Sequence, residues 1–122
     1  MQSQYRLKRR GDFKRAFRIG SSVANRQFVL YRSRRRDAGP VRIGISVSRK
    51  VGNAVIRNRI RRLVKEITRQ WVDDLPERTD LIVIARKPAA DMDYHQMKSS
   101  LRHVFRRAQL LDRPPAKNGL LR

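Results

Sequence analysis

The chain has 122 residues, of which 31 are Lys or Arg and 10 are Asp or Glu, so its formal net charge is +21. This length predicts a single domain with one modest core. A compact domain with so much uncompensated charge repels itself unless a polyanion neutralises it, which favours nucleic acid or an anionic membrane as the partner over a merely solvated basic surface. The absence of cysteine excludes disulfides, thiol catalysis and Cys-ligated zinc.

The sequence shows no targeting or membrane segment. The N-terminal stretch "MQSQYRLKRRGDFKRAF" lacks the apolar run of a signal peptide. The longest apolar run, Leu81 to Ala85, is far too short to span a bilayer. We therefore expect an intracellular, cytoplasmic protein.

The first elements are a lead-in and a short helix. Residues 1–9 are predicted to be a flexible basic lead-in. A helix is predicted over 10–19, because Phe13 and Phe17 are spaced i, i+4 and Gly20 is placed to end it. The following "SSVANRQ" is expected to be irregular or briefly extended.

Two strands are expected next. The stretch "FVLYRSRR" (28–35) is rich in strand formers. The stretch "VRIGISVS" (41–48) alternates, with apolar residues on one face and small ones, including Ser46, on the other. The turn signal "RRDAGP" separates them. We expect the two strands to pair as a hairpin.

A helix is expected from an N-cap at Asn53 to about residue 72. An advance of about 100° per residue gathers its apolar side chains into one arc of roughly 100°, which is the face expected to contact the core. These side chains are Ile56, Ile60, Leu63, Val64, Ile67 and Trp71.

The rest of this helix is almost entirely cationic, with Glu66 as its one acidic residue. Arg62 lies beyond a basic row on one shoulder, and Arg59 points to the far shoulder, about 160° from Arg57. Solvated helices usually mix charges of both signs, so this face predicts phosphate contacts. Arginine suits the phosphates of a folded nucleic acid better than a lipid surface. The row is Arg57, Arg61, Lys65 and Arg69.

Two groups of side chains allow alternative interpretations. Asn58 could read a base edge or a ribose, or could hydrogen-bond a neighbouring loop. The aromatic residues near the N-terminus could form a stacking surface for single-stranded nucleic acid, or could belong to the core. Because Phe28 and Tyr31 lie on opposite faces of their strand, they cannot both serve one purpose.

The last elements are a strand and a helix. The run Leu81 to Ala85 is continuously apolar, as in a strand buried on both faces. A helix capped by Asp93 should extend to about Leu110, followed by a flexible tail over 112–122. The strand–helix–strand order predicts two parallel strands, joined by a right-handed crossover according to the general rule.

No self-contained active site is predicted. Nine of the ten acidic residues fall in expected caps, loops or turns. The adjacent Asp73 and Asp74 are expected in a solvated loop rather than at a metal. His95 and His103 stand eight residues apart on one helix without a carboxylate partner at fixed spacing.

Three segments together resemble the protein component of bacterial ribonuclease P. They are "VANRQFVLY", "ISVSRKVGNAVIRNRIRRLVKE" and "LIVIARKPA", in this order and spacing. The Arg57-Asn58-Arg59 triplet is the signature of that family, and the resemblance covers about Leu7 to Leu111.

The resemblance implies a single RNA-binding α+β domain over 1–122, in the order α-β-β-β-α-β-α. It has a central mixed sheet, helices packed on that sheet, and a left-handed βαβ crossover like that of a ribosomal protein domain; "SSVA" would supply the additional strand. It also implies a protein subunit that binds the catalytic RNA and the 5′ leader of precursor tRNA. The RNA would carry the chemistry with Mg²⁺ that it mainly binds itself, with no metal intrinsic to the protein and neither DNA nor membrane as a partner.

Site residues follow from the same resemblance and from the basic row. The expected RNA-binding set is Ser48, Arg49, Lys50, Gly52, Asn53, Arg57, Asn58, Arg59, Arg61, Arg62, Lys65, Arg69, Arg86 and Lys87. The expected leader-binding cleft is formed by Phe13, Phe17, Tyr31 and Ser46. No catalytic or metal-binding residue is expected.

Two other functions compete with this one. A ribosomal or other structural RNA-binding protein of the same fold would bind RNA without affecting tRNA cleavage. A protein-only nuclease is disfavoured, because it needs clustered carboxylates or paired histidines that the sequence does not offer.

Overall fold

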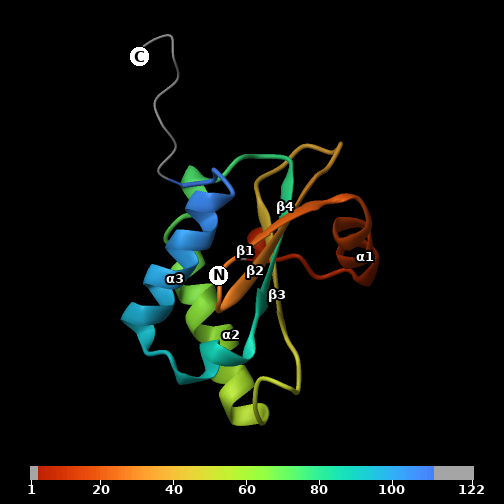
Figure 1. The fold of residues 1–122 in the computed structure, drawn as a ribbon. Helices are drawn as coiled ribbons and strands as arrows, with labels where there is room; N and C mark the ends of the chain where they lie inside the picture. The colour runs from red at the N-terminus through yellow and green to blue at the C-terminus, as the bar shows by residue number, and fades with distance from the viewer. Residues whose placement is uncertain (1–2, 112–122) are drawn as a thin grey trace, which may run out of the picture.

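The computed structural model describes residues 3–111 as a four-stranded sheet with α2 and α3 on one face and α1 on the other (Figure 1). The elements, in chain order, are α1 (Arg10–Ile19), β1 (Ser21–Ala24), β2 (Phe28–Arg34), β3 (Arg42–Val47), α2 (Ala54–Arg69), β4 (Thr79–Ala85) and α3 (Tyr94–Arg107). Short 3-10 turns occupy Ser3–Tyr5, Val72–Asp74 and Lys87–Asp91. The expected α+β class and element order, including the strand formed by "SSVA", are confirmed.

The strand order in the sheet is β1-β2-β4-β3. β2 pairs antiparallel with both β1 and β4, whereas β3 and β4 are parallel. The parallel pair joined by α2 is therefore as predicted, and it is the crossover for which the family resemblance implies a left hand.

The expected hairpin between the strands at 28–35 and 41–48 is wrong. β4 lies between them, pairing Phe28 with Ala85 on one side and Val47 with Ala85 on the other. The physical reason is the continuous apolar run of β4, which is buried over nearly its whole length and so requires a neighbour on each side and cover on both faces. The hairpin partner of β2 is β1 instead.

The main core lies between the sheet and the two helices α2 and α3. Ile60, Val64 and Ile67 of α2 are fully buried, and the Trp71 ring packs against Phe105 with centroids 5.2 Å apart. The predicted apolar face of α2 is thus confirmed. Ile56 and Leu63, at its margins, are only half-buried.

The helix ends follow their capping signals. The Asn53 side chain accepts from the Ile56 backbone N–H at 3.0 Å, so α2 begins where the cap predicts. Asp93 and Gln96 form a capping box at the start of α3. Both helices end a few residues before the expected positions, because Val72–Asp74 forms a separate turn and the chain leaves α3 after Arg107.

The expectation of a flexible lead-in over 1–9 does not hold for its described part. The Leu7 backbone N–H donates to the Ile43 carbonyl at 3.0 Å, and Arg6 forms a parallel bridge with Ile43. The Leu7 side chain is buried, which is what holds this segment against the edge of β3. The predicted flexible tail, 112–122, lies outside the described residues.

Across residues 3–111, none of the helices combines the length and apolarity that a bilayer span requires.

Candidate nucleic-acid interface

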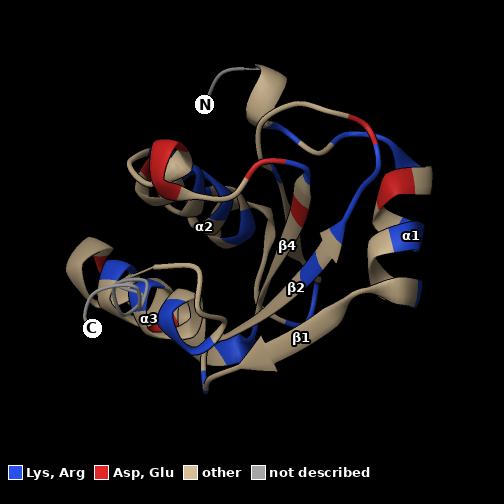
Figure 2. Ribbon diagram, turned by 90° about the horizontal axis from the view of Figure 1, so that it is seen from above, with Lys and Arg blue, Asp and Glu red and all other residues tan. Residues whose placement is uncertain are grey.

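α2 carries a series of Lys and Arg residues, as its sequence predicts (Figure 2). Arg62 and Arg69 are exposed, and Lys65 is half-buried. Within residues 3–111, no cation of α2 forms an ion pair with a carboxylate, even though Glu66 lies beside them. A shallow hollow runs along this surface, and we call it the basic face. It is lined by Asn58, Arg61, Arg62, Lys65, Glu66 and Arg69.

Two arginines of the basic row are held in place by neighbouring oxygens. Arg61 donates to the Asn58 side-chain oxygen at 3.1 Å and reaches the Val47 carbonyl at 3.5 Å. Arg57 donates through Nε to the Gly52 carbonyl at 3.2 Å. The Asn58 oxygen therefore positions a guanidinium of its own helix, a role that differs from both roles considered for it.

Arg59 points to the far shoulder of α2, as the helical projection predicts. It is half-buried there and donates from Nη2 to the Met92 carbonyl at 2.9 Å. Arg59 thus ties α2 to the chain just before α3. The triplet Arg57-Asn58-Arg59 therefore contributes two cationic side chains, and one of them, Arg59, also connects α2 to Met92.

The exposed residues that follow β3 and those that follow β4 lie at the same end of the sheet. Ser48, Arg49 and Lys50 follow β3, and Arg86 and Lys87 follow β4. The two strands are parallel and end in register at Val47 and Ala85, so both basic segments begin side by side. Arg86 also donates to the Asn25 carbonyl at 3.1 Å.

The N-terminal approach to α2 is closely packed at Gly52. A Cβ on this residue would lie 2.9 Å from the Ile56 side chain. Gly52 and the Asn53 cap therefore fix how the chain enters α2 after the basic loop. Both residues were predicted to bind RNA, and both have this structural role.

The predicted leader cleft lies on the opposite face of the sheet, where α1 covers only part of the strands. Phe13 packs directly on Gly44, whose Cβ, if present, would lie 2.5 Å from the Phe13 ring. Phe17 and Tyr31 meet edge to face at 5.0 Å, and Phe17 is 42% exposed. Ser46 lies in the next row of the sheet and is half-buried.

The four predicted cleft residues therefore gather on one face, and we call this region the aromatic cleft. Phe28, the remaining aromatic side chain considered for stacking, is fully buried on the other face among the core residues. Opposite faces for Phe28 and Tyr31 were predicted from their spacing, and this is confirmed.

The basic face and the aromatic cleft meet at the edge of β3. A small cavity of about 180 Å³ is shared by Arg61 and Lys65 of α2, Phe13 of α1 and Gly44 of β3. The two surfaces are therefore continuous across this edge of the sheet.

Sequence reasoning missed a buried ionic cluster at the base of α1. Asp80 was expected in a loop, yet it lies in β4 and accepts from Arg35 at 3.1 Å and from Arg42 at 2.8 and 2.9 Å. The hydrogen bond that Arg42 donates to Asp80 raises the pKa of Arg42; partial burial lowers this pKa, and the nearby carboxylates raise it further. Arg42 also approaches Asp12 of α1 at 3.5 Å. The available signal was an aspartate directly before a fully apolar strand.

Comparison with known proteins gives a consistent family. The family model described as Ribonuclease P matches residues 1–109. The chain is 45% identical over 115 residues to the "Ribonuclease P protein component" of Listeria welshimeri, covering 94% of this chain and 97% of the relative. It is 42% identical to the protein of the same name from Bacillus pumilus over 119 residues, covering 98% and 100%.

Solved structures agree. The RNase P protein of Staphylococcus aureus matches with a TM-score of 0.83 and 44% identity, covering 88% of this chain and 98% of that one. The RNase P protein of Thermotoga maritima matches with a TM-score of 0.74 and 33% identity, covering 84% and 96%. The chain belongs to the ribonuclease P protein family.

Proposed function

We propose that this chain is the protein subunit of ribonuclease P, which acts with a catalytic RNA to remove the 5′ leader from precursor tRNA. The observation that carries this proposal is the basic face of α2, whose cations lack carboxylate partners within residues 3–111 and which continues into the aromatic cleft. The reaction is inferred from family membership, and the role of this chain in the reaction is inferred from these two surfaces.

The basic face would bind the RNA subunit. A guanidinium group can donate two parallel hydrogen bonds to the oxygens of one phosphate. A row of guanidinium groups along one helix matches consecutive phosphates better than isolated guanidinium groups do. Arg62 and Arg69 are the most accessible cations of this helix. The loop with Arg49 and Lys50 and the segment with Arg86 would extend the contact along the neighbouring sheet edge.

The aromatic cleft would hold the unpaired leader. Base stacking on aromatic rings tolerates many sequences, which suits a leader that varies from one tRNA precursor to another. Phe17 offers an exposed ring, Tyr31 contacts that ring edge to face, and the half-buried Ser46 adds a hydroxyl that would hydrogen-bond the leader.

The chemistry would belong to the RNA, together with the Mg²⁺ ions it binds. Within residues 3–111, His, Asp and Glu side chains form no group of three suited to a metal ion. The buried carboxylate of Asp80 is already engaged by two guanidinium groups. The same proposal places the chain in the cytoplasm with precursor tRNA, and gives it no DNA or membrane partner.

A cleavage assay tests the proposal. A bacterial ribonuclease P RNA and precursor tRNA are incubated at low Mg²⁺ with and without this chain. We expect the chain to stimulate cleavage strongly and to show no cleavage without the RNA. Cleavage by protein and metal alone would contradict the proposal. Unchanged cleavage together with tight binding to ribosomal RNA would instead support a structural RNA-binding protein.

Matched variants separate the two surfaces. Arg62→Gln should weaken assembly with the RNA subunit whatever the substrate. Phe17→Ala should reduce affinity for a precursor with a long leader and leave a precursor with a one-nucleotide leader unaffected. Equal effects of Phe17→Ala on both substrates would contradict the assignment of the cleft to the leader.

A further inference from the structure

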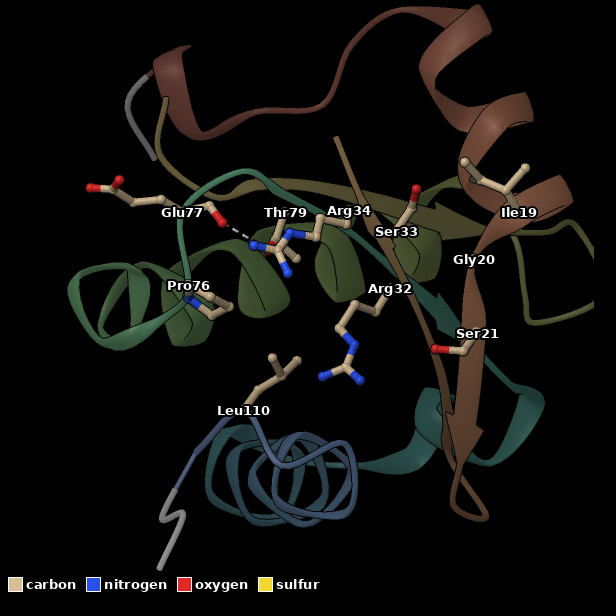
Figure 3. A pocket seen from close by; sticks show the side chains of 10 residues that line it. All are labelled: Ile19, Gly20, Ser21, Arg32, Ser33, Arg34, Pro76, Glu77, Thr79 and Leu110. Atoms are coloured by element: carbon tan, nitrogen blue, oxygen red, sulfur yellow. Dashed lines mark hydrogen bonds between the residues drawn. The ribbon is translucent and has the colours of Figure 1, made fainter. Parts of the chain in front are cut away.

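A third surface lies apart from both the basic face and the aromatic cleft. A cavity of about 560 Å³ opens at a corner of the sheet, between the distal end of β2, the segment leading into β4, and the residues after α3. Its size falls within the range of pockets that hold small ligands. Figure 3 shows the side chains that line it.

Two guanidinium groups point into this cavity. Arg32 and Arg34 are two residues apart on β2, so their side chains leave the same face, about 7 Å apart along the strand. Figure 3 shows both side chains beside the cavity. Arg32 donates one hydrogen bond, from Nη1 to the Ala108 carbonyl at 3.0 Å. The guanidinium of Arg34 donates no hydrogen bond to residues 3–111. Between them they leave most of their donors facing open space.

No carboxylate of residues 3–111 forms an ion pair with either arginine. Glu77 lines the cavity through its backbone, whose carbonyl accepts from Thr79, and its carboxylate points away (Figure 3). The ion pairs within the described residues involve Arg35 and Arg42, not Arg32 or Arg34. The cavity therefore has a positive wall that suits an anion.

Apolar side chains line another part of the cavity, beside polar residues such as Ser33 and Thr79. Pro76 and Leu110 present aliphatic side chains toward the same space, and Ile19, which is 54% exposed, stands at its rim (Figure 3). The Ser21 hydroxyl adds a polar group at the edge of β1. A ligand that matches both walls carries a phosphate next to a flat, largely apolar group.

We propose that this cavity is a second phosphate site, separate from α2 and the cleft, that binds one nucleotide. Arg32 and Arg34 hold its phosphate, and the base lies against Pro76 and Leu110. The nucleotide is either the 5′-phosphorylated end of an RNA strand or a free mononucleotide, which share this chemistry. The proposal does not rest on the proposed function, because it concerns the isolated chain.

Titration of the full chain with AMP, adenosine and inorganic phosphate tests the proposal, with backbone amide shifts followed by NMR. AMP should shift Ser21, Arg32 and Leu110, and should bind more tightly than either adenosine or phosphate. Phosphate binding as tight as that of AMP would overturn the nucleotide assignment. Shifts confined to α2 would overturn the site itself.

Variants of β2 and its following loop complete the experiment. Arg34→Gln should weaken AMP binding about tenfold, because one charge-assisted fork is lost. Arg36→Gln removes the same charge two residues away without lining the cavity, and should leave AMP binding unchanged. An equal loss of AMP affinity in both variants would mean that only the overall positive charge matters, and it would contradict the proposed site.

A 5′-phosphorylated trinucleotide identifies the source of the ligand. Tighter binding than AMP, lost in Arg34→Gln, assigns the cavity to an RNA end. Binding of AMP with exclusion of the trinucleotide assigns it to a free nucleotide. Binding of neither ligand at millimolar concentration overturns the proposal.

Discussion

Among individual residues, Asp80 has the most demanding environment. Its side chain and that of Arg35 are each 3% exposed, and it receives hydrogen bonds from two arginines. A buried ion pair contributes little net stability compared with an apolar replacement, but removal of one partner leaves a charge unpaired in the interior. Asp80 therefore neutralises the buried Arg35 and the partly buried Arg42, in a chain with only 10 acidic residues against 31 basic ones.

Asp80→Asn should lower the free energy of unfolding by about 3 kcal/mol, because Arg35 would remain buried without a counter-charge. Urea unfolding measures this loss. Asp73→Asn, at an exposed position in the turn after α2, should change stability by less than about 0.5 kcal/mol. Similar values for the two variants would show that the buried cluster is not needed for stability.

Arg59 and Arg62 allow stability and RNA binding to be separated. Arg59→Ala should cost about 1 kcal/mol in unfolding free energy, because the Met92 carbonyl loses its donor. Arg62→Ala, at an exposed position, should leave stability unchanged and weaken binding to the RNA subunit. Urea unfolding and filter binding on both variants test this pair. Unchanged stability in Arg59→Ala would mean that the Met92 contact is dispensable.

The sequence predicts which side chains of α2 face the core but not which oxygens its arginines contact. Helical periodicity alone separates Ile60, Val64 and Ile67 from the cations. The partner of Arg59 lies 33 residues further along the chain, at Met92, so local spacing carries no information about it. The same holds for Asp80, whose partner Arg35 lies 45 residues away.

Among the elements, α1 depends on a close contact with the sheet. The Phe13 ring occupies the space that a side chain at Gly44 would need, so this glycine allows α1 to lie near β3. The position of α1 in turn determines where Phe17 meets Tyr31, and thus the shape of the aromatic cleft.

Gly44→Ala should displace Phe13 and lower stability by about 1–3 kcal/mol, with weaker binding of a long leader. Gly11→Ala is the matched control, since a Cβ there would meet nothing within 4 Å and alanine favours the helical conformation. Thermal unfolding and binding of leader-bearing precursor would be measured for both. Full stability in Gly44→Ala would mean that α1 can shift without cost.

The elements themselves could be predicted from local signals, but their neighbours in the sheet could not. Alternation, apolar runs and capping residues predicted β2, β3, β4 and the helices to within a few residues, whereas β1 was predicted as a strand only by the family resemblance. Strand pairing is non-local, and short sequence separation favoured a hairpin between β2 and β3 that does not form. The burial of β4 on both faces was the stronger signal, and it requires a central position in the sheet.

For the whole molecule, which carries a net charge of +21, the number of phosphates that its cations contact determines how binding responds to salt. If about six phosphates are contacted, a plot of log affinity against log salt concentration should have a slope of about −4 to −5. Exchanging Arg62 and Arg69 for glutamine should make this slope shallower by about 1–2. Affinity for the RNA subunit, measured at several salt concentrations, checks both values. A slope near zero would contradict phosphate binding by the basic face.

The central position of β4 also affects the order in which the chain can fold during synthesis on the ribosome. β3 has no neighbouring strand until residues 79–85 have emerged, and until then β2 can pair only with β1. More than two-thirds of the polypeptide must therefore leave the exit tunnel before the sheet can close. Until that point, the apolar sides of two strands and of α2 lack their final cover, and a nascent chain is most exposed to aggregation or proteolysis in this interval.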